Sequence, residues 1–138
     1  MAVPNDIALT EDLGRGVFSG KEAKRARRSR VSSNVFLSQK GSTEISVDRL
    51  TLAPEDKATA IAGKVASARN REFYGWAVVT AAKAGDDGRR VKATPTTDNP
   101  YHADIILPDL AAQDEEEQKR HAQELADTSR WRERPNVS

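Results

Sequence analysis

A histidine and an aspartate stand two residues apart directly after a turn, and this pair has the chemistry for acid–base work. His102 and Asp104 follow Asn99-Pro100, a dipeptide typical of tight turns, and they begin an apolar segment typical of a β-strand. Side chains two residues apart in a strand point to the same face of a sheet. The sequence therefore predicts that His102 acts as a general acid or base and that Asp104 orients it.

A third member of this constellation would have to come from a neighbouring strand. The alternative is that His102 only hydrogen-bonds to the backbone near the turn. The second histidine, His121, lies four residues after Glu117 on a predicted helix, where a surface pair is expected. Two histidines without any cysteine provide too few ligands for zinc, so we expect no metal and no cofactor. The candidates for the third member are Ser32, Ser33, Asn34, Ser46 and Asp48.

The other chemical signal is a run of basic residues near the N-terminus. From Arg15 to Arg30 the chain carries seven basic side chains against one acidic side chain, a net of +6, whereas the whole chain carries +1. Several arginines in one arm can neutralise phosphates and release counterions, which gives salt-sensitive binding without sequence preference. The residues predicted to contact nucleic acid are Lys21, Lys24, Arg25, Arg27, Arg28 and Arg30.

Other partners fit the same run. An acidic protein could bind it, and so could the acidic block at residues 114–117, either in the same chain or from a second copy in a homo-oligomer. We expect a small non-catalytic accessory protein that contacts a polyanion, with nucleic acid favoured. The alternatives are a small enzyme acting on a nucleotide or nucleic acid with His102 as general acid or base, and a protein–protein assembly module.

The elements that must position these residues follow from the hydrophobic pattern. Alternation over residues 44–50 predicts a strand, and the apolar residues 35–37 before it predict a hairpin partner. Pro54 opens a helix with an apolar stripe that ends near Asn70. Residues 73–82 predict a central strand, the turn at 85–88 predicts a hairpin with 89–94, and residues 102–107 form another strand. A last helix runs from Asp114 to Trp131, with a thin apolar face that is expected to dock weakly.

This order, β-β-α-β-β-β-α, predicts an α+β fold with a mainly antiparallel sheet of about five strands and two helices. We expect three parts: an N-terminal extension over residues 1–30 with a flexible basic arm, a single α+β domain over residues 31–131, and a C-terminal tail over residues 132–138. The arm is polar on nearly every side and would become helical only on a partner.

Composition removes several classes of protein. The absence of cysteine excludes disulfides, zinc–thiolate sites and iron–sulfur clusters. The apolar stretches all fall short of the roughly 20 residues that a membrane helix needs. We therefore expect a cytoplasmic protein without membrane contact.

Overall fold

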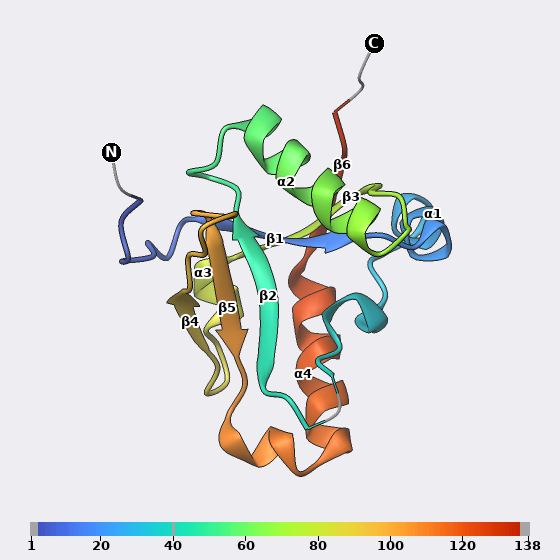
Figure 1. Cartoon of the computed structure of the whole chain (residues 1–138). Coiled ribbons are helices and arrows are strands. Elements are labelled where there is room, and N and C mark those ends of the chain that lie inside the picture. The colour runs from blue at the N-terminus through green and yellow to red at the C-terminus, as the bar shows by residue number, and fades with distance from the viewer. Residues whose placement is uncertain (1–2, 40, 136–138) are drawn as a thin grey trace.

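The computed structural model describes residues 3–39 and 41–135, and its centre is one antiparallel sheet of six strands in the order β4-β5-β2-β1-β3-β6 (Figure 1). The α+β class and the antiparallel sheet are confirmed, but the described residues form six strands and four helices where about five strands and two helices were expected. The strands are β1 (Asp12–Val17), β2 (Glu44–Arg49), β3 (Gly75–Thr80), β4 (Arg90–Ala93), β5 (His102–Ile106) and β6 (Arg130–Glu133).

Helices cover both faces of the sheet. The helix α2 packs on one face over Leu50 and Trp76, and α4 packs on the other face over Leu13, Phe36 and Ile45. Within the described ranges, none of the helices is both long and apolar enough to cross a membrane. The helices are α1 (Gly20–Arg28), α2 (Glu55–Ala68), α3 (Ala81–Ala84) and α4 (Glu115–Thr128), with short 3₁₀ turns η1 (Ser33–Phe36) and η2 (Asp109–Ala112).

The N-terminal residues belong to the fold, which differs from the expectation of a flexible extension up to residue 30. β1 lies between β2 and β3, and Leu13 is fully buried. Glycines at 14 and 16 lower the strand propensity of this segment, so its pattern is weak. The structure requires Gly14, because a Cβ there would lie 2.4 Å from Cδ1 of Leu50. The helix α1 then packs against the core through Ala23 and Ala26.

Three other elements differ from the expectation. Residues 35–37 form no hairpin strand, because the 3₁₀ turn η1 occupies 33–36. The turn at 85–88 joins no hairpin either, since α3 redirects the chain and β4 pairs with β5. The last helix ends at Thr128, and β6 follows and pairs with β3, so Arg132 and Glu133 belong to the sheet and not to a tail. The last residues of the predicted tail, 136–138, lie outside the described residues.

The helix α4 docks more firmly than its thin apolar face predicts. Gln118, His121, Ala122, Leu125 and Ala126 are all buried. The alanines allow a close approach to the sheet, and polar side chains with internal partners complete the contact. The predicted surface position of His121 is therefore wrong.

A buried ion pair fastens the chain ahead of β1. Arg49 donates from Nε and Nη2 to the two carboxylate oxygens of Glu11, both at 3.0 Å. The same guanidinium donates to the carbonyls of Pro4 and Asp6. Because Arg49 is 1% exposed and Glu11 is 5% exposed, this clamp is part of the core.

Candidate functional site

The strands bring polar residues together on the face of the sheet that α2 covers. In the β2–β5 register, Asp48 lies opposite His102, and Ser46 lies opposite Asp104. Two of the five predicted third members, Ser46 and Asp48, are therefore neighbours of the His102–Asp104 pair. Ser32, in contrast, caps η1 by accepting a hydrogen bond from the amide of Asn34.

The hydrogen bonds of His102 leave one ring nitrogen free. Its Nδ1 lies 3.1 Å from the carbonyl oxygen of Thr94 and 2.8 Å from the Thr94 hydroxyl. A carbonyl only accepts, so Nδ1 carries the proton and Nε2 carries the lone pair of the neutral ring. Within the described part of the chain Nε2 has no hydrogen-bond partner. Thr94, and not Asp104, therefore orients the imidazole.

The turn before β5 holds the carboxylate of Asp48. Asn99 donates from Nδ2 to Oδ1 of Asp48 at 2.8 Å, and its own Oδ1 accepts from the amide of Tyr101 at 3.0 Å. Burial raises the pKa of Asp48, although the Asn99 hydrogen bond and the charge of Arg15 act in the opposite direction. Asp48 is thus a half-buried acid opposite His102, whose Nε2 has no partner in the described chain.

Arg15 fills the wedge where β1 and β2 separate. These strands pair only at Leu13–Arg49 and Gly14–Asp48. Beyond that point Arg15 donates from Nη1 to the carbonyl of Ser46 at 2.8 Å and from Nε to the carbonyl of Val35 at 3.1 Å. Burial lowers the pKa of Arg15, and the nearby Arg69 lowers it further.

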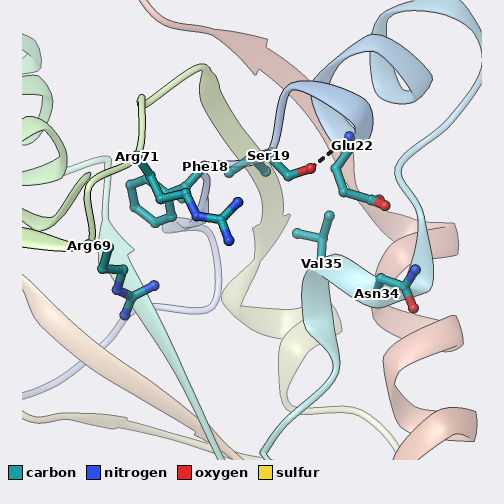
Figure 2. Close-up of a pocket in the computed structure, with 9 residues that line it drawn as sticks. Phe18, Ser19, Glu22, Asn34, Val35, Arg69 and Arg71 are labelled. Carbon is teal, nitrogen blue, oxygen red and sulfur yellow. Dashed lines mark hydrogen bonds between the residues drawn. The ribbon is translucent and has the colours of Figure 1, made fainter. Parts of the chain in front are cut away.

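Two adjoining cavities lie beside these residues. The inner cavity, of about 170 Å³, is lined by Arg15, Asp48, Asn99 and His102. The outer cavity is about 430 Å³ and holds Arg71 and Glu22 on opposite sides (Figure 2). Both share Gly16, Phe18 and Arg69, so they form one depression. We call it the α2 groove, defined by Arg15, Phe18, Glu22, Asp48, Arg69, Arg71, Asn99 and His102.

The end of α2 aims two arginines at this groove. Asn70 has a left-handed φ of 54°, and the amide of Arg71 donates back to the carbonyl of Ala66 at 2.8 Å. The guanidinium of Arg69 lies 5.4 Å from the ring centroid of Phe18. Sequence analysis missed Arg69 and Arg71, because only this helix ending and the position of β1 bring them to the groove.

The predicted nucleic-acid contacts lie elsewhere, on α1. Residues 21, 24, 25 and 28 are spaced to share one helix face, opposite the buried Ala23 and Ala26. We call this stripe the basic face of α1. Its members are exposed and form no ion pair within the described residues. Arg30 is also exposed and follows the helix. The basic face consists of Lys21, Lys24, Arg25 and Arg28.

Arg27 is the exception among the predicted contacts. It forms a bidentate ion pair with Glu133 at 2.8 and 2.5 Å. Its guanidinium also lies 6.0 Å from the ring centroids of Tyr74 and Trp131. Arg27 therefore joins α1 to β6 and points away from the basic face.

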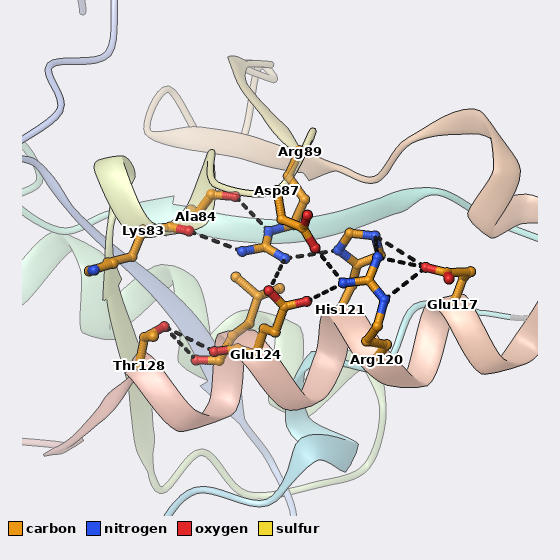
Figure 3. A network of polar contacts seen from close by, with 10 residues as sticks. Lys83, Ala84, Asp87, Arg89, Glu117, Arg120, His121, Glu124 and Thr128 are labelled. Atoms are coloured by element: carbon orange, nitrogen blue, oxygen red, sulfur yellow. Dashed lines mark hydrogen bonds and ion pairs between the residues drawn. The ribbon is translucent and has the colours of Figure 1, made fainter.

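The second histidine belongs to a network of arginines (Figure 3). Asp87, His121 and Glu124 form the one group in the described ranges whose ligand atoms are close enough for a metal, within 4.8 Å. However, Nη1 of Arg89 lies 2.8 Å from Nδ1 of His121, and Arg120 pairs with both carboxylates. Burial lowers the pKa of His121, and both arginines add to this effect. The guanidiniums use the lone pairs that a metal would need, so we assign an ion-pair network here.

Comparison of the chain with models of protein families, with curated proteins and with solved structures finds no match. Two regions of the molecule are therefore the candidates for function: the basic face of α1 and the α2 groove.

Proposed function

We propose that this chain binds nucleic acid through the basic face of α1. The observation that carries the proposal is the lack of counter-charges on that face. Four cations share the side of α1 that faces away from the buried Ala23 and Ala26, and none has a carboxylate partner within the described residues. Phosphates would supply the missing charges, and each contact would release counterions.

Several arginines elsewhere in the described structure do have a carboxylate partner, unlike the cations of the basic face. Six of the eleven arginines outside α1 have a carboxylate within ion-pair distance, whereas none of the four cations on the basic face has one among the described residues. The pairs outside α1 are Arg49–Glu11, Arg89–Glu124, Arg120–Asp87, Arg130–Asp12, Arg132–Glu55 and Arg134–Glu72.

The acidic block of the same chain does not neutralise the basic face. Glu116 and Glu117 pair with Lys119 and Arg120 of their own helix. The first turn of α4 and the helix α1 lie at different ends of the molecule (Figure 1). An intramolecular role for the basic face is thus unsupported within the described residues.

The chemistry of the face favours nucleic acid over an acidic protein. Protein interfaces are usually anchored by aromatic or large apolar side chains at their centre. The basic face contains only lysine and arginine, and the exposed leucines lie on other elements, such as Leu9 and Leu110. From residue 21 to residue 28 the face extends about 10 Å, enough to contact several phosphates.

The test is binding to a fluorescent duplex DNA and to an RNA of the same sequence, followed by anisotropy over a series of salt concentrations. We expect a linear log–log dependence on salt with a slope of about −4 for four contacts. Lys21→Glu with Lys24→Glu should weaken binding and reduce the slope by about 2.

The matched control is Lys57→Glu with Lys64→Glu on α2, where both lysines are also exposed. It changes the net charge by the same amount and should leave most of the binding in place. Equal losses in both variants would mean that only net charge matters, and the proposal would then be wrong.

A further inference from the structure

The α2 groove places two guanidiniums next to each other without a paired carboxylate. Arg15 and Arg69 both line the inner cavity, and their like charges repel. Neither forms an ion pair with a described residue. An anion between them would remove this repulsion.

Hydrogen-bond donors remain available at this point. Arg15 uses Nε and Nη1 for backbone carbonyls, which leaves Nη2 without a partner in the described chain. The side chains of Arg69 and Arg71 donate no hydrogen bond to any described residue, although both line the outer cavity. Planar guanidinium groups suit the paired oxygens of phosphate and carboxylate.

Asp48 and Asp104 attract Arg15 through their charges, but neither forms an ion pair or a hydrogen bond with it. Asp48 accepts from Asn99, and Asp104 accepts from Ser46 at 3.4 Å. Glu22 lies on the opposite side of the outer cavity from the arginines (Figure 2), and its buried Oε2 has no hydrogen-bond partner among the described residues. That oxygen can accept a hydrogen bond from a hydroxyl or amino group of a ligand.

We propose that the α2 groove binds a small molecule that carries a phosphate or carboxylate group. The oxyanion lies between Arg15 and Arg69, and a polar group of the same molecule contacts Nε2 of His102. The combined size of the two cavities suits a metabolite better than a polymer. This inference is independent of the nucleic-acid proposal, because the basic face of α1 lines neither cavity.

The two histidines provide the test, since one lies in the groove and the other in the arginine network. Inorganic phosphate is titrated into labelled protein in chloride buffer at constant ionic strength, and the imidazole signals are followed by NMR. We expect a saturable shift of the His102 signals, with little change at His121. A parallel titration with acetate separates the two sources: saturation by phosphate alone identifies a phosphate ester, and saturation by acetate identifies a carboxylate.

Three variants make the test specific. Arg69→Gln removes an exposed guanidinium and should weaken phosphate binding about tenfold, the expected effect of losing a charge-assisted hydrogen bond. Arg90→Gln is the matched control, because Arg90 is exposed and lines neither cavity. Arg15→Lys should also weaken binding, since it keeps the charge but loses the planar fork.

A linear, non-saturating response, equal shifts at both histidines, or unchanged affinity in Arg69→Gln would overturn the proposal. The Lys21→Glu, Lys24→Glu variant should keep the full phosphate response at His102. The proposal for the groove and the proposal for the basic face can therefore be refuted independently of each other.

Discussion

The basic face of α1 and the α2 groove use the same side chains in opposite ways. On the basic face the cations are exposed, unpaired among the described residues and contributed by a single helix. In the groove, arginines from β1 and from the end of α2 meet acids and a histidine from β2 and β5. The first region presents its charges to solvent along one helix, whereas the second gathers charges from several elements around a small depression.

The difference explains why the two regions depend differently on the fold. Exposed charges act through solvent, so their substitution changes long-range attraction and has little effect on stability. Buried charges need their partners, and losing one leaves another without compensation. The same substitution should therefore have very different consequences in the two places.

The largest effect is expected at the buried Arg49–Glu11 clamp, which lines neither cavity of the groove. Arg49→Ala should lower the free energy of unfolding by about 3–5 kcal/mol, because it leaves Glu11 buried without its partner. Arg28→Ala on the basic face should change stability by less than about 0.5 kcal/mol. Urea denaturation of both variants measures the difference. Similar losses of stability in the two variants would mean that buried and exposed charges contribute alike to the stability of this protein.

Glu11 should make the clamp sensitive to acid. Burial alone would raise the pKa of Glu11, but the hydrogen bonds from Arg49 and from the amide of Ala8 lower it below the ordinary value of 4.5. The native state then binds fewer protons than the unfolded state, so this stabilisation is present above pH 4.5 and is lost as the pH falls through the lowered pKa. Denaturation from pH 7 to pH 3 should show this loss in the wild type and a smaller one in Glu11→Gln.

The salt dependence of nucleic-acid binding should distinguish the basic face of α1 from the α2 groove. Arg25→Gln with Arg28→Gln should reduce the slope of nucleic-acid binding by about 2, because two phosphate contacts are lost. Arg69→Gln with Arg71→Gln should leave the slope unchanged. Within α1, Arg27→Gln should also have little effect, since Arg27 is already paired with Glu133. If the slope falls equally in all three variants, the basic face and the groove act as one electropositive surface.

The smallest effect is expected at Asp48. Because its pKa is raised by burial, the ionised form destabilises the native state as the pH rises above the unfolded-state pKa. Asp48→Asn should therefore stabilise the protein at pH 7, by about 1 kcal/mol or less, and this gain should disappear at acidic pH, where Asp48 is protonated. If Asp48→Asn instead lowers the free energy of unfolding at pH 7, the ionised Asp48 carboxylate stabilises the native state.

Local signals predicted the elements with clear periodicity. The alternation around Ile45 and Val47 corresponds to β2, and the Pro54 start corresponds to α2. The hydroxyl of Ser19, a residue type favoured at helix starts, caps α1 by accepting from the amide of Glu22 at 3.3 Å. β1 and β6 were missed, because glycines weaken one pattern and the charged residues of the other resemble the end of a helix.

The sequence by itself determined the charge of α1, the same-face placement of His102 and Asp104, and the α+β class, because these depend on composition and on local period. Only the tertiary structure decided that Asp48 faces His102, that Arg15 fills the wedge between β1 and β2, and that Arg69 closes the groove. The physical reason is that strand order and the separation of β1 from β2 are set by packing on both faces of the sheet. No local pattern in the chain carries that information.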